Sequence, residues 1–252
     1  MVSSEDCGVD NLTRVNSSEE CLVIKTFGKV TGSGTLIVFI HGDGSSGGPS
    51  DYLYSLAARF SKDGVVAVGL IRPGYLDKAG QRSTGGSWCR EGDGYQPVVV
   101  DAVADAVKNL KAFHNAKTTI LVRHSGGAAI AGVILGRFPG LADAALLAAC
   151  PCNIVNWRVM RRGSNTWTRS LSPSDFTDAI PVGTRVIAVT GAEDSNTFPK
   201  IAEDYIKRLT AGGVDARFEL VPDAGHNQVI RTEQFFQALE ELLKQTKISK
   251  GP

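Results

Sequence analysis

One stretch near the middle of the chain passes from a strand-like pattern to a helix-like pattern through a single serine. The β-branched and apolar run Thr118–Val122 leads through Arg123 and His124 to Ser125, and small residues follow the serine. A serine at so sharp a turn tolerates little bulk around it, because its backbone is strained and the strand and helix pass close together. The pattern predicts a nucleophile elbow, with the Ser125 hydroxyl exposed and the Gly126 amide directed at an oxyanion. The usual pattern, G-x-S-x-G, lacks its first glycine here, and Arg123 stands in that place.

Apolar runs of strand length alternate with amphipathic segments of helical length along most of the chain. Runs 35–40 and 65–71 are apolar on both faces, which is typical of strands inside a sheet that helices cover on both sides. The alternation predicts one α/β domain with a mostly parallel sheet, helices on both faces and sites at the carboxyl ends of the strands. The expected strands are 21–27, 35–40, 65–71, the run before Ser125, 144–150, 184–190 and 216–221, and the expected helices are 51–62, 98–113, the segment from Ser125 to about 138, 199–209 and 234–245. Composition alone equally allows a helix at 144–150.

Four parts of the chain differ in pattern. We expect a polar N-terminal segment at 1–20 and the α/β domain at 21–247. Within that domain, 72–97 is a long Gly-rich loop, for which a surface excursion and a pocket wall are equally good interpretations. The segment 151–181 is too short for an elaborate lid, so we expect a small cap over the site.

Composition excludes several classes of partner. The 252 residues carry a formal net charge of +1 without a clustered basic stripe, which gives no general reason to bind nucleic acid or an anionic membrane. No apolar run approaches the roughly 20 residues that span a bilayer, and 1–6 does not resemble a signal peptide. We therefore expect a soluble chain whose partner is a small-molecule ester or amide substrate. The sequence does not indicate an oligomeric state.

The five cysteines leave at least one unpaired within a single chain. Cys7 and Cys21 bracket a polar segment that a disulfide would stabilise in place of a core. Such a bridge favours an extracytoplasmic protein, secreted or periplasmic with its signal removed, over a cytoplasmic one. Cys150 and Cys152 lie too close in sequence to bridge comfortably, so either Cys89 pairs with one of them or all three are buried thiols. No cysteine or histidine spacing matches a zinc site.

Two further strand ends supply the groups that would activate Ser125. A serine hydroxyl is a weak nucleophile until an imidazole takes its proton, and a carboxylate fixes that imidazole's tautomer and stabilises its charged form. Asp194, with Glu193 as the fallback, follows the strand at 184–190, and His226 follows the strand at 216–221. The order Ser, Asp, His is the one expected of a hydrolase with this strand and helix pattern.

These residues make the chain resemble the α/β-hydrolase family over about residues 21–245. The motifs that carry the resemblance are His41-Gly42-Asp43-Gly44, His124-Ser125-Gly126-Gly127, the turn ending in Asp194, and Gly225-His226. The small cap and the segment 215–226 look like those of the dienelactone-hydrolase and prolyl-oligopeptidase-like branches. The resemblance implies an α/β-hydrolase fold with Ser125 as nucleophile, His226 as base and Asp194 as its orienting acid. It also implies an oxyanion hole formed by the amides of Asp43 and Gly126.

Four large side chains are candidates for substrate binding. Trp88, Trp157 and Trp167 would line an acyl or aromatic pocket, although tryptophan is as often ordinary core. Arg123 must either point out between neighbouring strands or distort the elbow. Our hypothesis is that Arg123 reaches the edge of the site, where it affects substrate choice or reduces activity.

These features predict a serine hydrolase that cleaves a carboxylic ester through an acyl-enzyme. They imply no metal and no organic cofactor. An amide or peptide substrate is the second interpretation. A binding protein that keeps the fold but has lost efficient catalysis because of Arg123 is the alternative from another class, and a lyase using the same triad is the third option.

Overall fold

The computed structural model describes residues 7–17, 19–29, 34–44 and 47–248. An eight-stranded sheet in the order β1-β2-β4-β3-β5-β6-β7-β8 forms its centre. The strands are β1 (Arg14–Asn16), β2 (Cys21–Phe27), β3 (Thr35–Ile40), β4 (Val65–Leu70), β5 (Thr118–His124), β6 (Ala144–Ala148), β7 (Arg185–Gly191) and β8 (Asp215–Val221). β1 pairs antiparallel with β2 and β2 antiparallel with β4, whereas all the other pairs are parallel.

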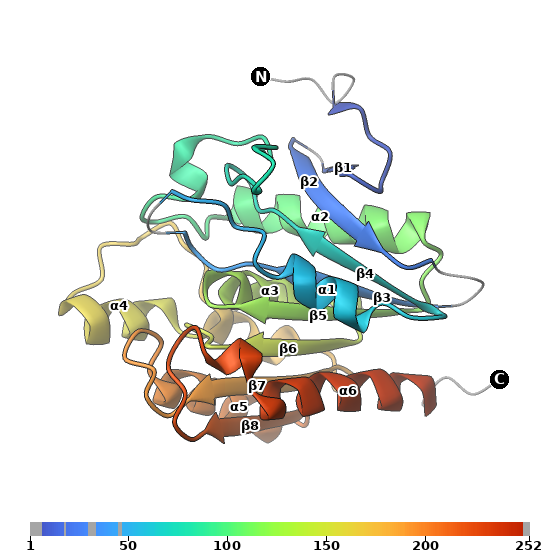
Figure 1. Ribbon diagram of the computed structural model, residues 1–252. Coiled ribbons are helices and arrows are strands. Elements are labelled where there is room, and N and C mark those ends of the chain that lie inside the picture. The colour runs from blue at the N-terminus through green and yellow to red at the C-terminus, as the bar shows by residue number, and fades with distance from the viewer. Residues whose placement is uncertain (1–6, 18, 30–33, 45–46, 249–252) are drawn as a thin grey trace.

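Helices cover both faces of the sheet (Figure 1). One face packs against α2 (Pro97–Phe113), α3 (Gly126–Arg137) and α5 (Pro199–Ala211), and the other against α1 (Tyr54–Phe60) and α6 (Glu233–Ile248). Side chains that alternate along β5 divide between the two faces, with Leu121 in the core under α2 and α3 and with Ile120 and Val122 in the core under α1 and α6. This double cover explains why the central strands are apolar without alternation.

The predicted fold class and the predicted strands and helices are confirmed, with boundaries that differ by a few residues. The run at 144–150, which composition left open, is the strand β6 between β5 and β7. Two elements were not predicted: β1, which lies inside the polar segment 1–20, and α4 (Ile154–Arg162), which lies inside the insertion 151–181. That insertion also contains the 3-10 helix η3 (Pro173–Ala179), and the loop 72–97 contains η2 (Ser87–Cys89). Residues 1–6 and 18 of the polar segment, residues 30–33 between β2 and β3, and residues 45–46 of the Gly-rich loop after β3 lie outside the described residues.

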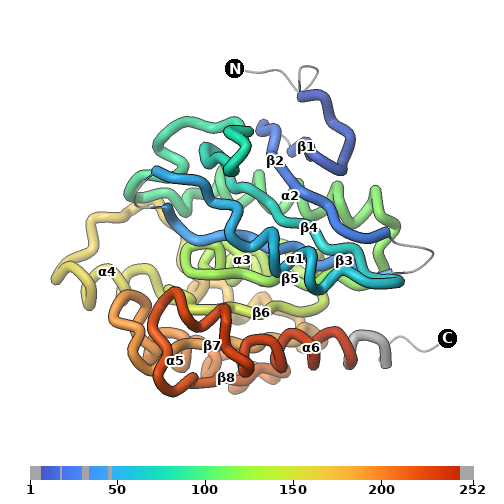
Figure 2. Tube along the Cα trace, in the orientation of Figure 1, coloured from blue at the N-terminus to red at the C-terminus, as the bar shows by residue number. Residues whose placement is uncertain are grey.

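The carboxyl ends of the parallel strands meet at one edge of the sheet, where the predicted site residues also lie. Figure 2 shows that the chain leaves β6 at this edge, runs out to α4, and later returns there in the loops that follow β7 and β8. The last short helix, η4 (Val229–Arg231), lies in the loop between β8 and α6. Among the described residues, no helix has the length and apolar character needed to cross a membrane.

Two disulfides are present, and one of them contradicts what the spacing of the cysteines predicts. Cys7 and Cys21 are bridged, with their Cα atoms 5.7 Å apart, so the bridge ties the N-terminal segment to β2. Cys150 and Cys152 are bridged to each other, with Cα atoms 5.0 Å apart, although we expected their closeness in sequence to prevent this. Ala149 adopts a positive φ of 49° just before this pair, so the chain turns sharply as it leaves β6. Cys89 is left as a buried free thiol.

This pairing predicts the result of thiol counting. Without reductant, we expect no reactive thiol in the native protein and one per chain, Cys89, after unfolding in guanidinium chloride, because burial protects this thiol and raises its pKa to about 11. Titration with a chromogenic disulfide reagent gives the count, and a Cys89→Ser variant serves as the control with none. Three free thiols in the unfolded protein would mean that one of the two bridges does not form.

Candidate active site

Ser125 lies at the turn between β5 and α3 in a strained backbone conformation, with φ 53° and ψ −124°. Three neighbouring glycines make room for this turn. A Cβ on Gly42 would lie 2.7 Å from the Ser125 Cβ, and a Cβ on Gly127 would lie 2.5 Å from the His41 carbonyl oxygen. A Cβ on Gly126 would overlap the Asp43 carboxylate. The loop after β3 therefore packs directly on the elbow, and glycine is needed at these three positions.

The three predicted catalytic side chains form one hydrogen-bonded chain. The Ser125 hydroxyl lies 3.0 Å from Nε2 of His226, and Nδ1 of His226 lies 2.9 Å from Oδ2 of Asp194. A neutral imidazole with its proton on Nδ1 donates to Asp194 and accepts the serine proton at Nε2. This is the arrangement in which a histidine acts as general base toward a serine.

Asp194 is held by the turn that follows β7. Its Oδ1 accepts hydrogen bonds from the backbone amides of Asn196 at 2.8 Å and Thr197 at 2.9 Å, and its Oδ2 accepts one from the Thr197 hydroxyl at 2.7 Å. Burial raises the pKa of Asp194, but the contact with His226 and the bonds from Thr197 outweigh burial and bring the pKa below its usual value. Asp194 is thus a buried, ionised carboxylate directed at the histidine. The fallback, Glu193, is exposed.

A second chain of hydrogen bonds joins four segments around the nucleophile. The Gly42 amide donates to the Tyr52 hydroxyl at 2.6 Å, and that hydroxyl lies 2.7 Å from Nδ1 of His124. Nε2 of His124 lies 3.0 Å from the carbonyl oxygen of His226. Burial and the neighbouring His226 lower the pKa of His124 to about 4, so His124 is neutral and accepts at Nδ1 while it donates at Nε2. The loop after β3, the elbow and the loop that carries the base are therefore fixed to one another.

The loop after β3 is also fixed by an ion pair between the buried Arg72 and Asp43. Nη1 of Arg72 lies 2.7 Å from Oδ1 of Asp43, and the Tyr95 hydroxyl donates to Oδ2. Burial raises the pKa of Asp43, but Arg72 and then Tyr95 outweigh burial and hold the pKa below its usual value. Nε2 of His41 accepts from the Arg72 amide at 3.0 Å, while Nδ1 lies 2.7 Å from the Gly42 carbonyl oxygen. Burial and the Arg72 charge lower the pKa of His41 to about 3, so this histidine is a neutral support of the loop.

Two of the three predicted tryptophans lie beside the catalytic loops. Trp157 on α4 donates from Nε1 to the carbonyl oxygen of Asn196 at 2.8 Å, and its ring packs against that of Trp167 with centroids 5.4 Å apart. Trp167 also packs edge-on against Tyr95, with centroids 5.7 Å apart. These rings form an aromatic wall between the loop of Asp43 and the loop of Asp194. Trp88 lies apart from this wall, on η2, with 41% of its surface exposed.

Arg123 does not reach the surface. The side chain has an exposed fraction of 0%, and none of the described residues accepts a hydrogen bond from its three guanidinium nitrogens. Burial, with the nearby charge of Arg72, lowers the pKa of Arg123 well below its usual value. The elbow nonetheless forms, because the positions that demand glycine are those that face the loop after β3. The effect on substrate choice or activity that we hypothesised for Arg123 stays a prediction.

Several residues that complete the site were not predicted. They are Tyr52, Arg72, Tyr95, Asn196 and Thr197, whose contacts with the site are given above. Asn196 and Thr197 follow an aspartate by two and three residues, which is a spacing typical of an aspartate that caps its own turn. The other three come from distant segments and carry no local sequence signal. No cluster of three or more metal-binding side chains occurs in the part of the chain that the structure describes.

No protein-family model and no curated protein sequence matches this chain. Many solved structures do match its fold. A Pyrococcus furiosus esterase, Pf2001, superposes with a TM-score of 0.71 at 15% sequence identity, over 92% of this chain and 90% of the esterase. A serine hydrolase involved in carbazole degradation superposes with a TM-score of 0.66 at 16% identity, over 92% of this chain and 97% of that enzyme. The chain has the α/β-hydrolase fold.

A third similar structure shows how the α/β-hydrolase fold occurs inside a longer protein. The acylaminoacyl peptidase of Pyrococcus horikoshii superposes with a TM-score of 0.68 at 14% identity, over 90% of this chain. This chain spans only 40% of the length of that peptidase. At such low identities the likeness concerns the α/β-hydrolase fold itself, and the chemistry has to be argued from the residues of this chain.

The burial of Arg123 predicts that its removal stabilises the protein. We expect Arg123→Met, which keeps an unbranched apolar stem, to raise the free energy of unfolding by about 1–4 kcal/mol, because a buried charge without a partner bears an uncompensated desolvation penalty. Denaturant unfolding measures the change. Arg137→Met, which removes a half-exposed arginine paired with Asp101, should instead change stability by at most about 1 kcal/mol. A clear loss of stability in Arg123→Met would contradict this expectation and show that the Arg123 charge is compensated in solution.

Proposed function

We propose that this protein is a serine hydrolase that cleaves a carboxylic ester through an acyl-enzyme. The observation that carries the proposal is the chain of contacts from Ser125 through His226 to Asp194, at 3.0 and 2.9 Å, with Ser125 at a strained turn. The aromatic wall of Trp157 and Trp167 would contact the acyl or alcohol part of the substrate.

The first half of the proposed reaction forms the acyl-enzyme. His226 takes the Ser125 proton at Nε2, and the serine oxygen attacks the ester carbonyl carbon to give a tetrahedral oxyanion. The amides of Asp43 and Gly126 donate to this oxyanion, and the positive end of α3 adds to its stabilisation. Asp194 stabilises the imidazolium ion, which then gives its proton to the leaving alcohol as the carbon–oxygen bond breaks.

The second half returns the enzyme to its starting state. A water molecule gives a proton to His226 and attacks the acyl carbon, and the same two amides hold the second oxyanion. Collapse of this intermediate releases the carboxylic acid, and Ser125 takes the proton back from His226. The four anchored segments around the nucleophile keep the donors and the base in place through both halves.

An ester is preferred to an amide because the segment over the site is small. Between β6 and β7 the chain forms only α4 and η3, so nothing in this insertion resembles an added peptide-binding domain. A peptide or amide bond is the second candidate, and its support is the likeness in fold to the acylaminoacyl peptidase. The alternative of a binding protein depended on damage to the elbow by Arg123, and the contact distances around Ser125 argue against that damage.

Hydrolysis of p-nitrophenyl butyrate tests the proposal. We expect turnover in the unaltered protein and a loss of at least about 10³-fold in kcat for Ser125→Ala and for Asp194→Asn, which remove the nucleophile and fix the wrong imidazole tautomer. Butyryl p-nitroanilide, assayed in parallel, distinguishes ester from amide preference. Folded protein that hydrolyses neither compound, or a Ser125→Ala variant with undiminished turnover, would refute the proposal.

The ion pair between Arg72 and Asp43, in the loop after β3, gives a further prediction. Arg72→Gln should lower kcat for the butyrate ester by about 10–100-fold, because the Asp43 carboxylate then lies uncompensated beside Gly126, where negative charge develops in the transition state. Asp43→Asn in the same background should recover part of this loss. Equal losses in the single and double variants would show that the Asp43 charge is not the cause.

A further inference from the structure

Three arginines on α4 stand beside the proposed catalytic site without a carboxylate partner. They are Arg158, Arg161 and Arg162, and none of them is within 4.0 Å of an acidic group of the described residues. Positions three and four apart on a helix are neighbours, so Arg158 lies next to both of the others on the helix surface. Like charges so placed repel one another, which opposes the favourable interaction of Arg161 and Arg162 with the carboxyl end of the helix.

Arg158 is directed at the aromatic wall. Its Cζ lies 4.4 Å from the centroid of Trp167, so the guanidinium stacks on the ring that also packs against Tyr95. The side chain is partly buried, and its Nε has no hydrogen-bond partner among the described residues. Burial and then the charge of Arg162 lower the pKa of Arg158, whereas Tyr95 raises it. The Tyr95 hydroxyl binds Asp43, so Arg158 is linked to the loop after β3 through Trp167 and Tyr95.

Arg161 is linked to the catalytic histidine through one side chain. Its Nε donates to Oδ1 of Asn196 at 3.0 Å, and this bond turns Nδ2 of Asn196 toward His226, 3.2 Å from Nε2. Nε2 is the atom that receives the Ser125 proton in the proposed reaction. Arg161 therefore lies two contacts away from the proton-transfer step, and its side chain is exposed beyond this bond.

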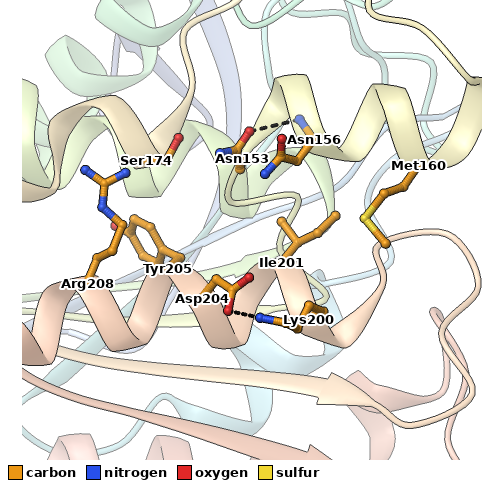
Figure 3. A pocket seen from close by; sticks show the side chains of 9 residues that line it. All are labelled: Asn153, Asn156, Met160, Ser174, Lys200, Ile201, Asp204, Tyr205 and Arg208. Carbon is orange, nitrogen blue, oxygen red and sulfur yellow. Dashed lines mark hydrogen bonds and ion pairs between the residues drawn. The ribbon is translucent and has the colours of Figure 1, made fainter.

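Three acidic groups of the loops around the site have partners of their own. Asp43 is paired with Arg72, Asp194 with His226, and Asp93 with Arg169. The small pocket between α4 and α5, about 80 Å³ in volume, contains Asp204, but Figure 3 shows this carboxylate bonded to Lys200. α4 contributes Asn156 and Met160 to that pocket and none of its arginines. Among the described residues, the arginines of α4 thus have no ion-pair partner, and Arg161 lies against the loop that carries Asp194.

We propose that Arg158 and Arg161, with Arg162 adding to the field, bind a carboxylate carried by the substrate, so that the preferred esters are monoesters of dicarboxylic acids. A guanidinium matches a carboxylate in planar, two-point geometry, and a stacked guanidinium keeps its outer nitrogens free for this contact. The inference rests on the proposed function and names its substrate class. The bound carboxylate supplies the countercharge that α4 lacks.

Three p-nitrophenyl esters with six-carbon acyl chains test this proposal. They are the anionic monoester of adipic acid, the neutral hexanoate and the cationic 6-aminohexanoate, each corrected for hydrolysis without enzyme. For the unaltered protein we expect kcat/KM for the anionic ester to exceed that for the neutral ester by about tenfold, and the cationic ester to be the poorest. Raising the salt concentration to about 0.5 M should reduce the anionic preference.

Variants assign the preference to α4. Arg158→Gln with Arg161→Gln should bring the anionic-to-neutral ratio of kcat/KM close to one, and Arg158→Glu should move the preference toward the cationic ester. The neutral ester corrects for any general loss that follows a shift of Asn196. Arg158→Lys keeps the charge and should keep most of the ratio. Arg185→Gln, which removes a charge from the amino end of β7, should leave the ratio unchanged.

The outcomes separate the two proposals. Hydrolysis of all three esters without an anionic preference, or a preference that persists in the double variant, overturns the role of α4 and leaves the serine hydrolase standing. Failure to hydrolyse any of the three overturns both. The carboxylate site is established if the preference is lost in the double glutamine variant, moves toward the cationic ester in Arg158→Glu and is kept in Arg158→Lys.

Discussion

The close approach of the loop after β3 to the turn at Ser125 is the constraint on which the rest of this structure depends. Three glycines permit it, because side chains at 42, 126 or 127 would collide with Ser125, with Asp43 or with the His41 backbone. The approach places Asp43 against Gly126, and the amides of these two residues form the oxyanion hole that we propose. It also brings Gly42 within reach of Tyr52, whose hydroxyl continues the hydrogen-bond chain to His124 and the carbonyl of His226. A strained serine is tolerated here because its surroundings hold it from several sides.

The carboxylates around the site are compensated by partners in neighbouring loops. The two carboxylates of the site, Asp43 and the buried Asp194, each meet a cation or an imidazole, and His41 and His124 are neutral because burial lowers their pKa values. Arg123 inside the protein and the arginines of α4 at its surface do not have such an oppositely charged partner among the described residues. The first lacks an acceptor among the described residues, which marks it as a cost to stability. The second group contacts Asn196 and Trp167 beside the catalytic loops, where we propose that it recognises a substrate carboxylate.

The sequence was informative where local pattern and function coincide. Ser125, Asp194 and His226 each follow a strand, so the rule that parallel strands end at one edge was enough to bring them together. β1 was missed because a run of three residues, of which only Val15 is apolar, becomes a strand only by pairing with β2. The disulfide between Cys150 and Cys152 depends on the sharp turn after β6, which spacing does not reveal. Tyr52, Arg72 and Tyr95 act through partners 10 to 72 residues away, and such contacts leave no trace in a local pattern.

The central claim is that Ser125 is an activated nucleophile. Its most direct test is to find which side chain of the folded protein reacts with a probe for activated serines. The protein is treated with a fluorophosphonate probe, and the adduct is located by mass spectrometry of the intact chain and of its peptides. We predict a single adduct on Ser125, absent in Ser125→Ala and formed far more slowly in His226→Gln, since His226 generates the nucleophile. An adduct elsewhere, or labelling of Ser125 at the same rate without His226, would contradict the proposed mechanism.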